Sequence, residues 1–152
     1  MTSTAPVPTG TATGIDPRGP QVAAAITAVV LVVVLLLPGP WAAVLAGIQA
    51  VLFAIGATRG VQHTPHAWLF RTAVRPRLSA PHDLEDPAPP RFAQGVGLAF
   101  TLVALVGFAS GVTLLGQVAI GLALVAALLN AVFGLCLGCE LYLILKRFSA
   151  AR

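Results

Sequence analysis

Residues 21–40 read QVAAAITAVVLVVVLLLPGP, an unbroken apolar run that ends in Pro-Gly-Pro at 38–40. A run of this length is at the short end of what crosses a hydrocarbon core of about 30 Å as a helix. The Pro-Gly-Pro sequence does not continue a helix and favours a tight turn. A second apolar run starts directly after it. The stretch therefore predicts two membrane-spanning helices, at about 21–37 and 41–58, joined as a hairpin.

Two further apolar runs occupy the C-terminal half of the chain, at about 95–115 and 118–145. Only Gly116 and its neighbours separate them, so we expect a second hairpin. Hydrophobic residues make up 57% of the 152 residues and charged residues 9%, whereas roughly 25% of an average globular chain is charged. So few charges do not cover the surface of a water-soluble domain. The predicted fold class is an all-α integral membrane protein with four transmembrane helices as two hairpins.

The first run has a second interpretation, as a cleaved signal peptide that would leave three spans. A signal peptide has a basic N-terminal region and a small-residue cleavage site, whereas a lone Arg18 precedes this run and no A-x-A site is obvious after it. We therefore expect an uncleaved protein with a single four-helix membrane domain at 16–148. A disordered tail, 1–15, rich in Thr, Pro, Gly and Ala, precedes it, and a short tail, 149–152, follows.

The nine Lys and Arg residues fall in three places: before the first span, between the second and third, and after the fourth. The two predicted hairpin turns carry none. Cytoplasmic loops of membrane proteins are enriched in Lys and Arg. We therefore expect a multi-pass protein of the cell (inner) membrane with both termini and the linker 59–94 in the cytoplasm. The net charge of +4 does not indicate nucleic acid, because the arginines flank apolar runs. The expected partner is the lipid bilayer.

Within the linker, the sequence HTPHAWLFRTAVRPRL predicts a short helix with Thr64 as its cap. On a helical projection its apolar residues share one face, Arg71 and Arg75 lie on the other, and Trp68 lies at their side. This pattern is typical of a helix that lies along the inner leaflet with its arginines toward anionic headgroups. The alternative is a docking site for a cytosolic partner.

The pattern D-P-x-x-P-x-x-A occurs at 16–23 and again at 86–93, each time just before an apolar run. Further along, Gln49-Ala50-Val51 resembles Asn130-Ala131-Val132. Together these matches suggest a parallel internal repeat of the hairpin; the alternative is chance, because these residue types are common in the chain. A repeat would let Gln49 and Asn130 form a hydrogen bond inside the membrane.

The last apolar run contains GLCLGCELYLILKR, with Cys136, Cys139 and Glu140. C-x-x-C is the spacing of dithiol redox sites and of soft-metal sites. An intramembrane carboxylate is costly and is therefore a functional hypothesis by default. We expect Glu140 to modulate the thiols and to form an ion pair with Arg59, which the repeat would place opposite it.

A continuous helix to residue 145 places the two thiols near its C-terminal end. The helix dipole and the charge of Glu140 disfavour a thiolate at that position. A regular helix also holds two such sulfurs poorly for a disulfide. Three interpretations of the pair stay open: small side chains packed beside an ion pair, thiol or sulfane-sulfur redox, and soft-metal handling.

Other residue types that carry catalysis give no motif. The histidines, His63, His66 and His82, lack the spacing of a zinc site with four ligands, so we expect no metal. The sequence has no Ser-His-Asp order, no paired carboxylates and no phosphate-binding glycine loop, and we expect no cofactor. Whether the protein is an enzyme stays open.

A resemblance to a known family rests on four segments of the sequence: DPRGPQ, HAWLFRTAVRPRL, LEDPAPPRFAQGVGLAF and LGCELYLILKR. In combination they resemble the domain of unknown function 4395 family, which comprises small multi-pass membrane proteins of actinobacteria and related organisms. The resemblance covers about residues 14–148 and implies a membrane architecture with several spans.

Members of that family occur near thioredoxin-like and sulfurtransferase genes, which implies thiol or sulfur redox. Cys136 and Cys139 would then be the redox thiols, and the partner would be a cytosolic thioredoxin-like or sulfurtransferase protein. We therefore expect an accessory in cytoplasmic-side thiol or sulfur redox. The alternatives are a structural or assembly subunit without chemistry, soft-metal handling, and small-solute transport, for which such short spans would have to form a homo-oligomer.

Overall fold

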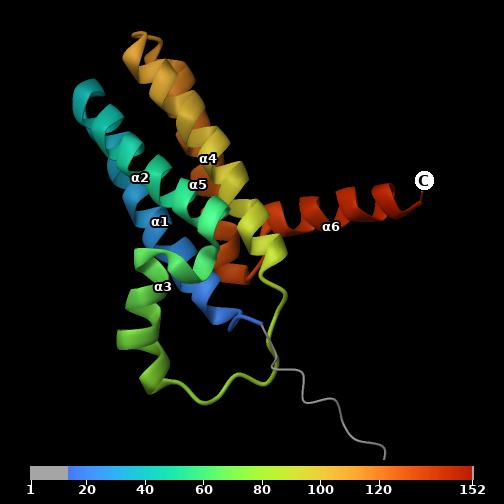
Figure 1. Ribbon diagram of the computed structural model, residues 1–152. Helices are drawn as coiled ribbons and strands as arrows, with labels where there is room; N and C mark the ends of the chain where they lie inside the picture. Colours follow the sequence, from blue (N-terminus) through green and yellow to red (C-terminus); the bar gives the residue numbers. More distant parts are fainter. Residues whose placement is uncertain (1–13, 152) are drawn as a thin grey trace, which may run out of the picture.

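The computed structural model describes residues 14–151, and within this range the chain forms helices and no strand. Four of the helices are long and apolar enough to cross a membrane (Figure 1), which confirms the prediction of an all-α membrane protein with four apolar helices. Residues 1–13 of the predicted tail at 1–15 lie outside the described residues. The four helices are α1 (Arg18–Leu36), α2 (Gly39–Arg59), α4 (Ala88–Ala109) and α5 (Thr113–Phe133).

Shorter elements follow α2 and α5. They are η1 (Val61–His63), α3 (Pro65–Leu69), η2 (Phe70–Val74) and η3 (Arg75–Arg77) in the linker, and α6 (Leu137–Ala150) at the C-terminal end.

The connection between α1 and α2 lies where the sequence predicts it, at Leu37 and Pro38. Pro38 has an extended backbone with φ −66° and ψ 154°, and α2 starts with Gly39 and Pro40. A proline in the first turn of a helix disrupts no hydrogen bond, since its missing N–H would have no partner there. The Pro-Gly-Pro sequence therefore ends one helix and starts the next.

The connection between α4 and α5 lies at residues 110–112, where Gly111 has a φ of +78°. The sequence placed this turn at Gly116, which is wrong. Gly116 is a buried residue inside α5, and a Cβ there would lie 2.6 Å from Cε1 of Phe108. The glycine allows a close approach between the two helices, and the sequence alone does not distinguish that role from a turn.

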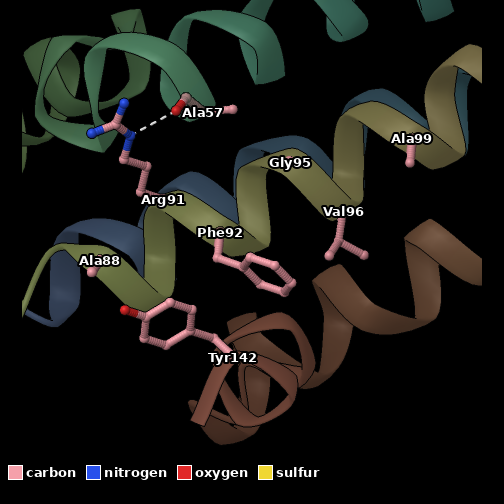
Figure 2. Close-up of a pocket in the computed structure, with 8 residues that line it drawn as sticks. All are labelled: Ala57, Ala88, Arg91, Phe92, Gly95, Val96, Ala99 and Tyr142. Atoms are coloured by element: carbon pink, nitrogen blue, oxygen red, sulfur yellow. Dashed lines mark hydrogen bonds between the residues drawn. The ribbon is translucent and has the colours of Figure 1, made fainter. Parts of the chain in front are cut away.

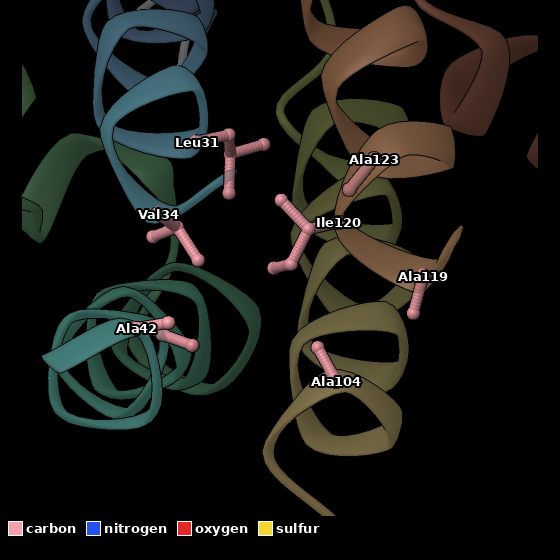
Figure 3. Close-up of a cluster of buried hydrophobic side chains, with 8 residues drawn as sticks. Leu31, Val34, Ala42, Ala104, Ala119, Ile120 and Ala123 are labelled. Atoms are coloured by element: carbon pink, nitrogen blue, oxygen red, sulfur yellow. The ribbon is translucent and has the colours of Figure 1, made fainter. Parts of the chain in front are cut away.

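The core of the bundle consists of small and aliphatic side chains (Figure 3). Helix α1 packs against α5, and α2 packs against α4. Alanines let helix backbones approach closely, which favours association inside a bilayer, where burial of apolar surface gives no advantage. The buried cluster comprises Leu31, Val34, Ala42, Ala46, Ala104, Ala119, Ile120 and Ala123.

We call the end of the bundle at which α1 and α4 begin, and α2 and α5 end, the base. Here α2 is followed by Gly60 with a φ of +100°, and α5 by Gly134 with a φ of +68°. Glycine adopts positive φ values without the steric cost that a Cβ would bring. After Gly60 the chain packs α3 against α1, and after Gly134 it packs α6 against α4.

The predicted fourth span at 118–145 is not one helix. The N–H of Gly134 donates to the carbonyl of Asn130 (3.0 Å), and the N–H of Leu135 donates to the carbonyl of Leu129 (3.2 Å). These bonds satisfy the last carbonyls of α5 and end it at Phe133. Helix α6, red in Figure 1, then runs outward from the base at a steep angle to α5. The apolar sequence pattern continues across this junction, so the break could not be recognised from the sequence.

Candidate functional site

The two cysteines of the C-x-x-C sequence form a disulfide at the start of α6. Their Cα atoms lie 5.2 Å apart, within the usual range for a disulfide. Cys136 precedes the helix with φ −87° and ψ 97°, an extended backbone, and Cys139 lies in the first turn. The constraint that a regular helix would place on the two sulfurs therefore does not apply, because only one of the two residues is helical.

The polarity of the site is also the reverse of the expected one. The cysteines lie at the N-terminus of a helix, whose unpaired N–H groups and dipole favour an anion such as a thiolate. Sγ of Cys136 caps the helix by accepting the backbone N–H of Cys139 at 3.3 Å. Glu140 is exposed and lies in this first turn, where a carboxylate is favourable as well.

Gly138, between the two cysteines, seats α6 on α4. A Cβ at this position would lie 2.6 Å from Cβ and 2.7 Å from Cα of Ala93, so no side chain fits without a shift. Further along α6, the Tyr142 ring packs on the Phe92 ring with centroids 5.7 Å apart. Both rings line a groove between α4 and α6 (Figure 2), which has a volume of about 550 Å³.

The expected ion pair between Arg59 and Glu140 does not form. Among residues 14–151 the ion pair present is Arg18–Asp16 (2.9 Å). Because α6 turns away at Gly134, Glu140 does not come to lie over the end of α2. Arg91 of α4 occupies that end instead, donating from Nε to the carbonyl of Ala57 at 2.7 Å (Figure 2) and from Nη2 to the carbonyl of Thr58 at 2.6 Å.

A cavity of about 350 Å³ opens beside the disulfide, between α1, α4, α5 and α6. Cys136 lines it, and Cys139 does not. Thr27, Gln94 and Asn130 bring a hydroxyl and two amides to a lining that is otherwise apolar and has no charged side chain. Its apolar residues include Pro20, Phe53, Pro90, Phe100, Ala126 and Leu141.

The linker residues singled out from the sequence lie on the other side of the base. Thr64 caps α3 by accepting the N–H of Ala67 (3.3 Å), as predicted. Trp68 and Arg71 are exposed, and Nη1 of Arg71 donates to the carbonyl of Gln62 (3.1 Å). Burial lowers the pKa of the neighbouring His66.

Phe70 holds this linker segment to the start of α1, where a Cβ on Gly19 would lie at an ordinary distance of 3.5 Å from its ring. Arg71 and Arg75, with Asp16, line a second cavity of about 370 Å³ between α1 and the linker. This base region is charged, unlike the cavity at Cys136.

The expected hydrogen bond between Gln49 and Asn130 is not made. Gln49 is 1% exposed, and neither its Nε2 nor its Oε1 has a partner among the described residues. Gln49 lies in the middle of α2, whereas Asn130 lies one turn from the end of α5 and faces the cavity. The two residues therefore occupy different depths, and their alignment in the proposed repeat is wrong.

Thr27, Gln94 and Gly138 were not among the site residues predicted from the sequence. Thr27 and Gln94 are polar residues in or beside apolar runs. Such a residue can be assigned to one face of its helix only when the packing of the helices is known. Within residues 14–151 no group of three or more His, Cys, Asp or Glu side chains gathers to hold a metal ion.

Comparisons with known proteins give one family match. The model of a family described as Domain of unknown function (DUF4395) matches residues 15–147, so the chain belongs to this family. No curated protein and no solved structure matches the chain.

Proposed function

We propose that this DUF4395 protein exchanges electrons with thiols at the cytoplasmic face of the cell membrane through Cys136 and Cys139. The observation that carries the proposal is the position of the pair. It forms a disulfide at the N-terminus of α6, next to a cavity of the helix bundle. Two cysteines that served only packing would need neither a disulfide between them nor an extended backbone at Cys136.

The geometry supports an order of events in thiol–disulfide exchange. A partner thiolate attacks Sγ of Cys139, which is half-buried and outside the cavity. The S–S bond breaks and Cys136 leaves as a thiolate, which the N–H of Cys139 and the helix dipole stabilise. A second thiol of the partner then displaces Cys139. The partner ends as a disulfide, and Cys136 and Cys139 end as thiols.

The cytoplasmic placement of the base rests on charge. All nine Lys and Arg residues lie at the first residue of α1, at the last residue of α2, in the linker, in the first turn of α4, or in and after α6, and none lies at the connections opposite the base. The positive-inside rule then places the base in the cytoplasm. An accessory of this kind fits a soluble thioredoxin-like or sulfurtransferase partner, which would reach Cys139 from that side.

Two base segments would lie against the inner leaflet. In the linker, Trp68 offers an exposed ring beside the cations of Arg71 and Arg75. Helix α6 exposes apolar side chains along its length, and Lys146 and Arg147 follow near its end. Such helices insert their apolar side into the headgroup boundary and keep their cations near anionic lipids.

An internal duplication of a larger unit than a hairpin is part of the proposal. Each unit would comprise two long helices and a base segment: α1, α2 and α3 in one, α4, α5 and α6 in the other. The N–H and carbonyl of Ile15 bond the carbonyl and N–H of Glu85, both at 2.9 Å. These residues precede the Asp-Pro pairs of the repeated pattern, so equivalent residues meet each other, as expected of residues on a twofold axis.

The proposal is tested by incubating the oxidised protein in membranes with a reduced thioredoxin-like protein. Differential alkylation and mass spectrometry then report the state of each cysteine. We expect Cys136 and Cys139 to become thiols while the partner becomes a disulfide, and a partner that lacks its second thiol to leave a mixed disulfide with Cys139. A pair that stays oxidised while the partner reduces a control peptide disulfide would favour a structural subunit.

A further inference from the structure

We infer that the cavity beside Cys136 binds the headgroup of a membrane quinone, which accepts the electrons of the Cys136–Cys139 dithiol. The inference rests on the proposed thiol function and deepens it by naming the electron acceptor. Four observations carry it: the depth of the cavity, the chemistry of its lining, its volume, and the unequal placement of the two cysteines.

The cavity extends from the base into the membrane-spanning part of the bundle. Pro20 and Thr27, both in its lining, are seven residues apart on α1, which corresponds to about 10 Å along the helix axis. Pro90 and Phe100 are ten residues apart on α4, which corresponds to about 15 Å. A molecule in this cavity would enter from the bilayer, which favours a lipid-soluble ligand over a soluble one.

The lining matches a neutral ring with polar edges. No charged side chain lines the cavity, which disfavours an ionic solute. The amides of Gln94 and Asn130 and the hydroxyl of Thr27 are hydrogen-bond donors suited to carbonyl oxygens. The rings of Phe53 and Phe100 offer aromatic packing. An acyl chain would use none of these polar groups, whereas a quinone has two carbonyl oxygens and a planar ring.

The volume is sufficient for such a headgroup. Small-molecule sites occupy about 300–1,000 Å³, and this cavity measures about 350 Å³. A ring with the start of its isoprenoid tail is near the lower end of that range, and the rest of the tail would extend into the bilayer.

The two cysteines have different roles in the reaction, because only Cys136 lines the cavity. After a soluble dithiol has reduced the pair, the Cys136 thiolate delivers electrons to the quinone and Cys139 attacks Sγ of Cys136. One S–S bond forms, two S–H bonds are lost, and the quinone gains two electrons and two protons as the quinol. The soluble dithiol is the reductant of the cycle, and the quinone is its oxidant.

The test uses the full chain in lipid nanodiscs, anaerobically and without endogenous quinone. The pair is first reduced with dihydrolipoamide, the excess is removed, and a short-chain benzoquinone is added. Quinol formation is followed by absorbance, and the cysteines are analysed by alkylation and mass spectrometry. We expect one quinol for each disulfide formed.

Ala126→Leu fills the cavity from α5 and should slow quinol formation about tenfold, equivalent to about 1.4 kcal/mol, with exchange against dihydrolipoamide unchanged. Gly121→Leu is the matched control on the same helix, because a Cβ at Gly121 has nothing within 4 Å; it should leave both rates unchanged. If Ala126→Leu does not fold, Asn130→Leu tests the same point, since it keeps side-chain volume and removes the amide.

Three results are decisive. Exchange with dihydrolipoamide without any quinol formation overturns the quinone site and leaves the thiol function standing. Absence of both reactions overturns the proposed function itself. Equal quinone rates in the wild type, Ala126→Leu and Gly121→Leu would show that the quinone reacts outside the cavity and would also overturn the site.

Discussion

Residues 18–77 and 88–150 each form two long helices followed by a base segment that packs on the first of them. Helices α2 and α5 both have 21 residues, and a glycine with positive φ follows each. In the first half, the segment after that glycine presents arginines to a cavity that also contains Asp16. In the second half, α6 starts with a disulfide beside a cavity without charged side chains.

The scaffold of the two halves is therefore separable from the chemistry that each half carries. The glycine caps and the packing of each base segment set where the chain turns, and both halves use them. The residues directly after the cap then decide the local chemistry: Val61-Gln62-His63 in one half, Leu135-Cys136 in the other. The two halves should therefore differ in how strongly each depends on its glycines and charges.

The largest effect is expected from Gly138→Ala in the second half. The new Cβ would lie 2.6 Å from Cβ and 2.7 Å from Cα of Ala93, so α6 has to move away from α4. Overpacking of this kind costs about 2 kcal/mol, and we expect a lower thermal midpoint in detergent and a smaller disulfide fraction. The matched variant in the first half is Gly19→Ala, where the Cβ would lie 3.5 Å from the Phe70 ring.

Gly19→Ala should change the free energy of unfolding by less than about 0.5 kcal/mol. Equal losses for the two variants, measured by thermal unfolding, would mean that α6 is not seated on α4 more tightly than the linker is on α1.

A smaller effect is expected from the two capping glycines. Gly134→Ala and Gly60→Ala each force a Cβ into a positive φ of +68° or +100°, at a cost of about 1 kcal/mol at Gly134 and at least as much at Gly60. Only Gly134→Ala should alter the reactivity of the thiols, because only this cap aims the chain at Cys136. Gly134→Asn should recover part of the loss, since asparagine tolerates the left-handed region. Unchanged alkylation rates in Gly134→Ala would contradict this assignment.

The four spans could be predicted because apolar length and Pro-Gly-Pro depend on local sequence alone. The candidate site could be predicted only in part. Cys136 and Cys139 stood out by their spacing, but Gly134 was not recognised as a helix end, because Leu135, Leu137 and the residues after them continue the apolar pattern. That single misassignment reversed the helix polarity at the thiols and created an Arg59–Glu140 pair that the structure does not contain.

The same limit applies to the cavity. Thr27, Gln94 and Asn130 come from three helices, and their convergence depends on α1 packing against α5. The sequence instead suggested that the second and fourth spans pair. Equivalent positions of a repeat can be found from a shared motif, as at Asp16 and Asp86, but which helices then touch depends on the tertiary packing.

The smallest effect concerns pH and the charged base of the first half. The hydrogen bond from the Arg18 side chain holds the pKa of Asp16 below its ordinary value. A carboxyl with a lowered folded-state pKa contributes stability above its unfolded pKa of about 3.9, and that contribution is lost as pH falls through the folded value. When the pH is lowered from about 6 to about 3, thermal unfolding should therefore show a smaller loss of stability in Asp16→Asn than in the wild type. The two losses should differ by less than about 1 kcal/mol in the free energy of unfolding.

Asp86→Asn is the control from the second half. Asp86 accepts the N–H of Ala88 at 2.9 Å but makes no ion pair among the described residues, and asparagine caps equally well. A pH response as large as that of Asp16→Asn would show that the two Asp-Pro pairs do not differ in their electrostatics.

The most direct test of the redox assignment is a titration of the pair in membranes. The protein is equilibrated with mixtures of reduced and oxidised dithiothreitol or glutathione, quenched with acid, and alkylated, and the Cys136–Cys139 disulfide is quantified by mass spectrometry. We expect a reversible two-electron transition, reached from both the oxidised and the reduced side, with the same midpoint. A pair that stays wholly oxidised or wholly reduced at every ratio, from both directions, would contradict the redox assignment.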